Sequence, residues 1–181
     1  AWAYSCEPIR LKRSGWWGAG IVALCYEGLP WFTGAAVMSQ TFPNLNIVLI
    51  ASLYAVGAHG IMTLNDFKAL DGDKQMGINS LPVKFGPDKA AKIACWVMTI
   101  PQLIVVMLMA SWGAIEYAIV VSCLVVGQLF AMRRLSKDPL KLAPWYNATG
   151  VLMFVLGMIG FLVLALMDNV LPVFFNWLTG S

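Results

Sequence analysis

The sequence is short of charge, and this shortage excludes an ordinary water-soluble domain. Charged residues make up 12% of its 181 residues and hydrophobic residues make up 60%, whereas a typical globular chain is about a quarter charged. The few cysteines (Cys6, Cys25, Cys95 and Cys123) are scattered without metal-ligand spacing, so we interpret them as small hydrophobic residues. The chain also lacks an initial Met and a signal segment, and we expect that residues upstream of Ala1 are missing from it.

Long apolar stretches are abundant instead. Crossing about 30 Å of hydrocarbon takes roughly 20 helical residues, and five stretches meet this length, at about 15–38, 46–64, 90–110, 114–132 and 146–167. Helices are expected because lipid offers no partner for free backbone groups. The sequence therefore predicts an all-α, polytopic transmembrane helix bundle. Pro30 and Pro101 should kink their spans, Pro87 should begin one, and the tail at 170–177 is too short to span, which favours an interfacial position.

The basic residues are restricted to three segments of the chain. Five spans bring these segments to one face of the bundle, and the positive-inside rule makes that face cytoplasmic and the C-terminus periplasmic. We expect the lipid bilayer, and no nucleic acid, to be the partner of this charge pattern. The three segments contain Arg10, Lys12 and Arg13; Lys68, Lys74, Lys84, Lys89 and Lys92; and Arg133, Arg134, Lys137 and Lys141.

Three carboxylates, Asp66, Asp71 and Asp73, follow the second span. On a helix, Asp66 and Asp73 are seven residues apart and share a face, while Asp71 points elsewhere unless Gly72 ends the helix. Clustered carboxylates beside lipid need a counter-charge, and Mg²⁺ is suited to one or two carboxylates completed by water and phosphate. The alternative is a solvated loop of mixed charge, because lysines are interleaved with the acids.

A basic arm, Arg10, Lys12 and Arg13, stands on the same face as the acids and precedes the pair Trp16-Trp17. Basic residues with interfacial tryptophans are explained by membrane topology alone. The alternative is that these cations bind the phosphates that a carboxylate-held metal also binds. An apolar bundle interior beside both groups would then accommodate the tail of a lipid diphosphate.

Two ionisable residues fall inside the predicted spans. Glu27 is a functional candidate because a carboxylate at membrane depth is costly, although it could equally bond to backbone freed by Pro30 or lie near the interface. His59 lies one heptad before Asp66 and so faces the same stripe. We treat both as cavity candidates, with packing or hydrogen bonding as the alternative for His59.

Several of these segments resemble the UbiA superfamily of intramembrane prenyltransferases, and within it the bacteriochlorophyll and chlorophyll synthase branch. The segment 4–13 is similar to the superfamily's segment before its fifth helix, and the segment from Asn65 to Gly86 is similar to its second aspartate-rich motif. The branch is suggested by four stretches: Cys25-Tyr26-Glu27-Gly28-Leu29-Pro30-Trp31-Phe32-Thr33-Gly34-Ala35, Gly57-Ala58-His59-Gly60-Ile61-Met62-Thr63-Leu64-Asn65-Asp66-Phe67-Lys68, Ala94-Cys95-Trp96-Val97-Met98 and Trp145-Tyr146-Asn147-Ala148-Thr149-Gly150.

The resemblance implies that residues 1–181 are the C-terminal part of one membrane prenyltransferase domain. The superfamily has nine helices and two aspartate-rich motifs, and this chain resembles helices five to nine with the second motif only. We therefore expect the chain alone to be inactive. The motif also departs from the common Asp-x-x-x-Asp pattern, because Leu70 stands four residues after Asp66, and Cys6-Glu7 stands where smaller residues or proline are usual.

The resemblance further implies a Mg²⁺-dependent enzyme that esterifies bacteriochlorophyllide with geranylgeranyl or phytyl diphosphate in the bacterial inner, intracytoplasmic, membrane. Its active site would be cytoplasmic, and association with other pigment-synthesis or light-harvesting proteins would fit this role. The catalytic residues would be Asp66, Asp73 and Lys12, with Asp66, Asp73 and Asp71 as metal ligands. Diphosphate binding would involve Arg10, Lys12, Arg13, Tyr4, Lys68 and Asn65.

Three alternatives stay open from the sequence. The chain could belong to a non-catalytic pigment- or lipid-binding subunit, to a prenyltransferase of the chlorophyll, quinone or haem type, or to a small transporter. A transporter predicts polar residues along the full depth of a pathway, and the connections on the far side are nearly bare of charge.

Overall fold

The computed structural model describes residues 2–179, and it describes side chains up to residue 160. The described chain is helical without a strand, which confirms the predicted all-α class. In order, the elements are α1 (Trp2–Ser5), η1 (Leu11–Arg13), α2 (Gly15–Ala23), η2 (Leu24–Gly28), α3 (Leu29–Ser39), α4 (Leu45–Asn65), η3 (Asp66–Ala69), α5 (Leu70–Gln75), α6 (Leu81–Phe85), α7 (Pro87–Ser111), α8 (Ile115–Leu135) and α9 (Pro139–Thr179).

Five helical segments of the described chain are long and apolar enough to cross a membrane, as predicted. They are Gly15–Ser39, Leu45–Gln75, Pro87–Ser111, Ile115–Leu135 and Pro139–Gly160. The first is a composite of α2, η2 and α3, in which η2 is a π-helical turn closed by the Leu29 N–H donating to the Leu24 carbonyl. Pro30 follows directly, so its missing donor falls where the helix already departs from the regular bonding pattern.

The last helix, α9, is longer than the sequence indicated. Its start at Pro139 precedes the expected span, because Asp138 caps it: the Lys141 N–H donates to Asp138 Oδ1 at 3.2 Å. Proline suits the first helical turn, where its missing donor would be unpaired in any case. The segment 170–177, expected as a short tail after the fifth span, is part of the same helix, because α9 continues without a break to Thr179. The side chains of this tail lie outside the described residues, so its interfacial position stays a prediction.

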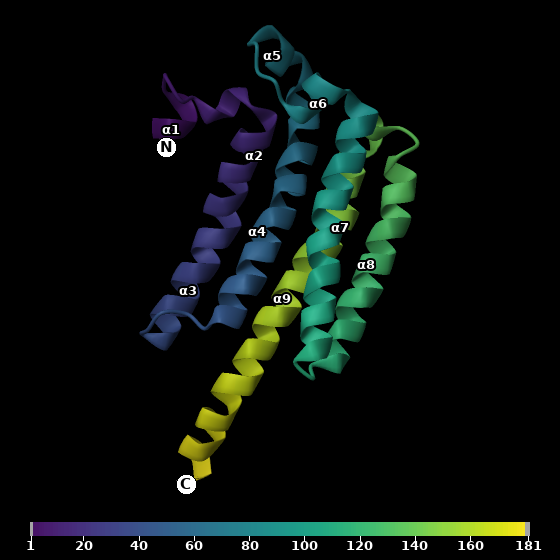
Figure 1. Cartoon of the computed structure of the whole chain (residues 1–181). Helices are drawn as coiled ribbons and strands as arrows, with labels where there is room; N and C mark the ends of the chain where they lie inside the picture. The colour runs from purple at the N-terminus through teal and green to yellow at the C-terminus, as the bar shows by residue number, and fades with distance from the viewer. Residues whose placement is uncertain (1, 180–181) are drawn as a thin grey trace.

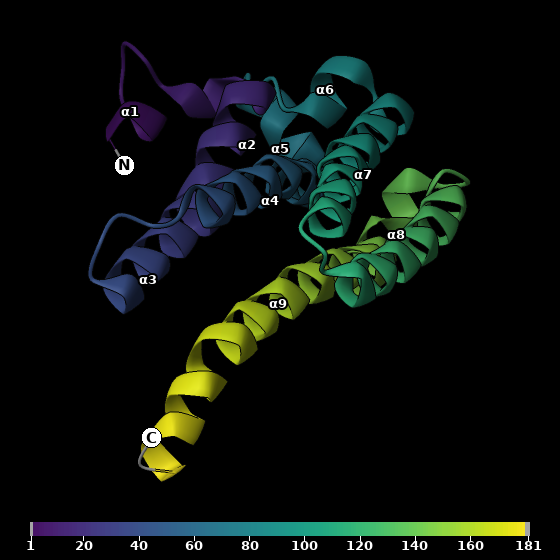
Figure 2. The ribbon, with the colours of Figure 1, turned by 60° about the horizontal axis from the view of Figure 1, so that its bottom comes forward.

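The helix α4 is the centre of the bundle. It packs on α2 and α7, while α7 packs on α8 and α8 on α9, an arrangement visible in Figure 1. Two glycines of α4 allow α7 and α9 to approach it closely. A Cβ added at Gly60 would lie 2.5 Å from Met98 Cγ of α7, and one at Gly57 would lie 2.6 Å from the Phe154 ring of α9. The first span is peripheral, with 6% of its apolar window buried against 56% for the span that contains α4. Figure 2 shows α9 extending away from the other helices toward its C-terminal end.

The three basic segments lie at one end of this bundle. Figure 1 shows the arm before α2, the connection from α4 to α7 and the connection from α8 to α9 at the same end, with the α3–α4 and α7–α8 connections opposite. This end, called the basic end below, also contains α5 and α6. The fold therefore brings the acids and the basic arm to one face, as the span count predicted.

Candidate functional site

Two of the three acids come together at the basic end. Asp66 is half-buried at the start of η3, and Asp73 is 8% exposed within α5. Their negative charges act on each other, as expected for neighbouring carboxylates. The helix continues through Gly72 to Gln75, so this glycine does not end it, and Asp71 is exposed.

Tyr4 of α1 joins these two acids from the far end of the sequence. Burial raises the pKa of the Tyr4 hydroxyl, and the negative charges of Asp66 and Asp73 raise it further. The tyrosine therefore stays protonated at neutral pH and can donate a hydrogen bond to an anion. Tyr4, Asp66 and Asp73 are called the acidic site below.

The basic arm does not act as one unit. Glu7 forms ion pairs with both arginines, with its Oε1 3.3 Å from Arg10 Nη1 and 3.0 Å from Arg13 Nη2. Lys12 is half-buried and has no ion pair among the described side chains. Arg10 and Arg13 line a separate pocket on the side of α6, and Lys12 and Tyr4 are not among its lining residues. The bridging role of Glu7 was missed in the sequence, although its spacing of three residues from Arg10 is typical of a local ion pair.

Asn65 and Lys68 flank Asp66 and are exposed. Asn65 Oδ1 accepts a hydrogen bond from Asn147 Nδ2 of α9 at 3.3 Å. Asn147 thus reaches the edge of the acidic site across a sequence separation of 82 residues. Such a long-range contact leaves no local signal in the sequence.

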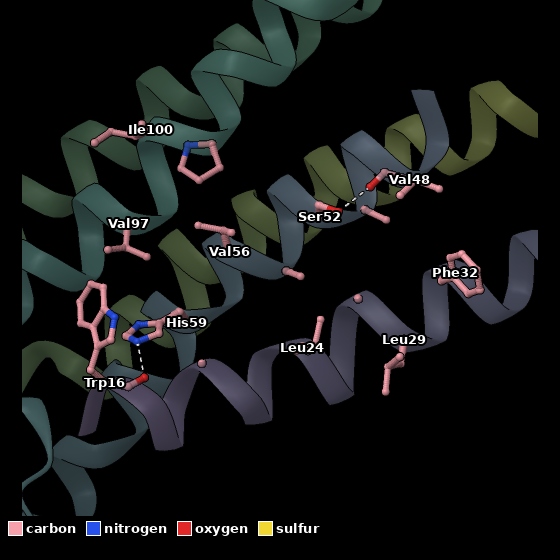
Figure 3. Close-up of a pocket in the computed structure, with 15 residues that line it drawn as sticks. Trp16, Leu24, Leu29, Phe32, Val48, Ser52, Val56, His59, Val97 and Ile100 are labelled. Atoms are coloured by element: carbon pink, nitrogen blue, oxygen red, sulfur yellow. Dashed lines mark hydrogen bonds between the residues drawn. The ribbon is translucent and has the colours of Figure 1, made fainter. Parts of the chain in front are cut away.

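An apolar groove of about 660 Å³ runs along the bundle between α2–α3, α4 and α7. Figure 3 shows Trp16 and His59 at one end of it and Phe32 and Val48 toward the other, with Val97 and Ile100 on the α7 side. Its polar groups are few, the main ones being the imidazole of His59 and the hydroxyl of Ser52, which donates to the Val48 carbonyl at 2.7 Å. The groove can hold a long hydrocarbon chain and exclude water from it.

His59 closes the end of the groove that lies toward Asp66. Its Nε2 lies 3.0 Å from the Trp16 carbonyl, its Nδ1 lies 3.4 Å from Thr63 Oγ1, and its ring centroid is 4.5 Å from that of Trp16. Because a carbonyl only accepts, Nε2 carries the proton and donates to it. Both ring nitrogens are thus engaged within the protein, an arrangement that joins α4 to α2.

Glu27 is outside the lining of the groove. Its side chain is half-buried in η2 and accepts a hydrogen bond from the side chain of Trp31, one helical turn further on. The Glu27 carboxylate therefore has a local partner in Trp31.

The acidic site fits a hard divalent cation. The structure places no Lys or Arg within ion-pair distance of Asp66 or Asp73 in its described part, and two carboxylates are a usual protein contribution to a Mg²⁺ shell. Within residues 2–160, no group of three or more His, Cys, Asp and Glu side chains is arranged to hold a metal. The remaining ligands would therefore come from water and substrate phosphate, which is the common mode for Mg²⁺.

Comparison with known proteins gives a consistent result. The UbiA prenyltransferase family profile matches residues 1–148. The bacteriochlorophyll synthase 33 kDa chain of Cereibacter sphaeroides is 64% identical over 158 residues, covering 87% of this chain and 52% of the relative. The 34 kDa chain from Chloroflexus aurantiacus is 43% identical over 159 residues (88% and 51%), and the chloroplastic chlorophyll synthase of Oryza sativa subsp. japonica is 37% identical over 160 residues (88% and 42%).

The chain spans about half the length of the curated relatives that it matches. The comparison with solved structures gave no significant match.

Proposed function

The chain belongs to the UbiA prenyltransferase family, and on this premise we propose that the complete protein joins a prenyl group to bacteriochlorophyllide. The donor is geranylgeranyl or phytyl diphosphate, and the acceptor is the propionate carboxylate of the tetrapyrrole. The high identity to bacteriochlorophyll synthase chains supports this choice of acceptor. The observation that carries the proposal is the position of the acidic site at the basic end, beyond the His59 end of the apolar groove.

The acidic site would receive the diphosphate. Asp66 and Asp73 would hold Mg²⁺, which supplies neutralisation of the charge that develops on the departing diphosphate. The Tyr4 hydroxyl donates to a phosphate oxygen, and Lys12, unpaired within the described residues, adds a positive charge at the same end of the bundle. Asp71, being exposed, contributes little.

The groove would receive the prenyl chain. Cleavage of the allylic C–O bond leaves a carbocation on the prenyl chain, and water would convert this cation to an alcohol. The apolar lining of the groove excludes water and so prevents this side reaction. The propionate attacks this carbon as an anion already formed at neutral pH, and no general base is needed. His59, with both nitrogens engaged, positions α2 against α4 rather than transferring a proton.

The membrane orientation belongs to the same proposal. We place the basic end on the cytoplasmic side of a bacterial inner membrane, where the positive-inside rule puts Lys and Arg. The diphosphate then reaches the acidic site from the cytoplasm, while the prenyl chain stays within the bilayer.

The direct test is esterification by the complete gene product in liposomes. We expect bacteriochlorophyllide and geranylgeranyl diphosphate to give the ester with Mg²⁺ and no ester with a chelator. Asp66→Asn should lower the esterification rate by about a thousandfold while the protein still elutes as a folded species. Ester formation at the same rate in chelator would contradict the metal, and binding of pigment without any turnover would favour a binding subunit.

A further inference from the structure

A second pocket, of about 670 Å³, lies at the basic end on the side of α6. One wall is the segment from Ile9 to Trp17 and the other runs from Asn79 to Phe85. It is separate from the acidic site, because neither Tyr4, Asp66 nor Asp73 lines it, and Trp16 is its only residue in common with the apolar groove. The proposed prenyl transfer leaves this pocket without a role.

The two walls are fixed to each other by the backbone. The Gly15 N–H donates to the Asn79 carbonyl at 2.8 Å, and the Asn79 N–H donates to the Arg13 carbonyl at 3.0 Å. Gly15 is buried, and a Cβ added there would lie 2.5 Å from the Leu81 nitrogen. The pocket is therefore a preformed hollow between two tied segments.

Positive charge dominates the polar lining. Arg10, Arg13 and Lys84 contribute three positive charges. Glu7, which bridges the two arginines, adds one negative charge beside them. Arg10 Nε is buried and has no hydrogen-bond partner in the described structure. The guanidinium groups already hold one carboxylate and keep capacity for a second acceptor, which is the arrangement that binds phosphate oxygens.

Aromatic side chains place the same pocket at the membrane surface. Trp16, Trp17 and Phe85 are 48%, 67% and 42% exposed, and all three line it. Lys84 Nζ lies 5.2 Å from the centroid of the Phe85 ring. Exposed tryptophans with basic residues mark the headgroup level of a bilayer, and basic pockets at that level favour anionic lipids.

We propose that this pocket binds the phosphate group of an anionic membrane lipid. Arg13 and Lys84 hold the phosphate from opposite walls, Trp17 and Phe85 contact the glycerol and the start of the acyl chains, and Glu7 competes with the lipid for the arginines. A soluble phosphate shares the charge chemistry but does not use the exposed aromatic rim. The site is independent of the prenyl transfer proposed above.

Lipid retention tests the site without any activity measurement. The complete protein is reconstituted in phosphatidylcholine vesicles containing a tenth of phosphatidylglycerol, purified in mild detergent, and analysed for bound lipid by mass spectrometry. We expect phosphatidylglycerol to be enriched over phosphatidylcholine. Arg13→Gln with Lys84→Gln should lower this enrichment by about tenfold or more, as expected for two cations at a membrane surface.

The matched control removes the same charge elsewhere at the basic end. Lys137 and Lys141 are exposed and lie outside the pocket, so Lys137→Gln with Lys141→Gln should keep the enrichment. Glu7→Gln should raise it, because the competing carboxylate is lost, and this opposite shift tests the site even if the double variant folds poorly. Equal enrichment in all variants, or full release of the lipid from wild type by millimolar inorganic phosphate, would overturn the proposal.

Discussion

At the residue scale, the carboxylates of the loop after α4 differ in burial, and burial separates their roles. Asp73 is buried and Asp66 half-buried, whereas Asp71 faces solvent. A carboxylate that loses water without a protein cation gains most from a bound metal. A solvated loop of mixed charge would instead leave all three acids exposed.

Replacing each acid by its amide therefore distinguishes them. In the complete protein, Asp66→Asn and Asp73→Asn should each lower kcat by about a thousandfold, roughly 4 kcal/mol, because charge stabilisation of the leaving group is lost. Asp71→Asn should lower it by less than about threefold. Steady-state esterification rates at saturating Mg²⁺ measure these effects. Three small, equal effects would indicate that the acids belong to a solvated loop and hold no metal.

Lys12 is the cation of the arm that Glu7 leaves free. Lys12→Gln should lower kcat/KM for the prenyl diphosphate by about a hundredfold, roughly 2.7 kcal/mol, because a charge-assisted contact to a developing anion is lost. The measurement is the rate at limiting diphosphate. Lys137→Gln, an equal loss of charge at the same end, serves as the control, and similar rates in both variants would make Lys12 a topology residue only.

His59 allows a test of structural against chemical roles. His59→Leu removes the donor to the Trp16 carbonyl, which should lower the free energy of unfolding by about 1–3 kcal/mol. We expect a lower melting temperature in detergent, while kcat at low temperature stays within about threefold of wild type. A large loss of turnover with an unchanged melting temperature would assign the imidazole to the reaction.

At the element scale, apolar length and charge position sufficed to predict the five spans and the shared basic end. The spans at 46–64 and 114–132 differ from α4 and α8 by at most three residues at either end. The agreement is close because an apolar segment in lipid must satisfy its own backbone hydrogen bonds, which a helix does. The pair Asp138-Pro139 is a helix-start signal for α9. A prediction from the length of apolar stretches alone does not detect it. The π turn η2 and the separation of Lys12 from the pocket that Arg10 and Arg13 line depend on packing, and no local sequence pattern encodes them.

The close contact of α4 with α7 depends on small residues. Gly60→Ala should lower the melting temperature, because its Cβ would collide with Met98 and the Ala94 carbonyl, and overpacking costs about 1–3 kcal/mol. Gly34→Ala is the matched control within α3, where a Cβ meets nothing within 4 Å. There the better helix propensity of alanine should leave stability equal or slightly higher. Equal losses at both positions would contradict the proposed packing role of Gly60.

At the scale of the whole molecule, charge is distributed unequally between the two ends of the bundle. All 12 Lys and Arg residues of the chain lie in the three segments of the basic end, and the α3–α4 and α7–α8 connections have none. The acidic site and the pocket beside α6 both lie at this end. In the proposed orientation, the basic end would face both the soluble diphosphate head and the anionic headgroups of the cytoplasmic leaflet.

This orientation can be measured with single cysteines in the complete protein after the native cysteines are removed. Ser136 at the basic end and Thr41 at the opposite end are both exposed, so Ser136→Cys and Thr41→Cys compare the two faces with similar access. An impermeant thiol reagent added outside intact cells should label Thr41→Cys and spare Ser136→Cys, because the positive-inside rule predicts a cytoplasmic location for the basic end. Labelling of both after permeabilisation shows that each site is reactive. The reverse pattern in intact cells would place the acidic site outside the cytoplasm, where the proposed diphosphate substrate could not reach it.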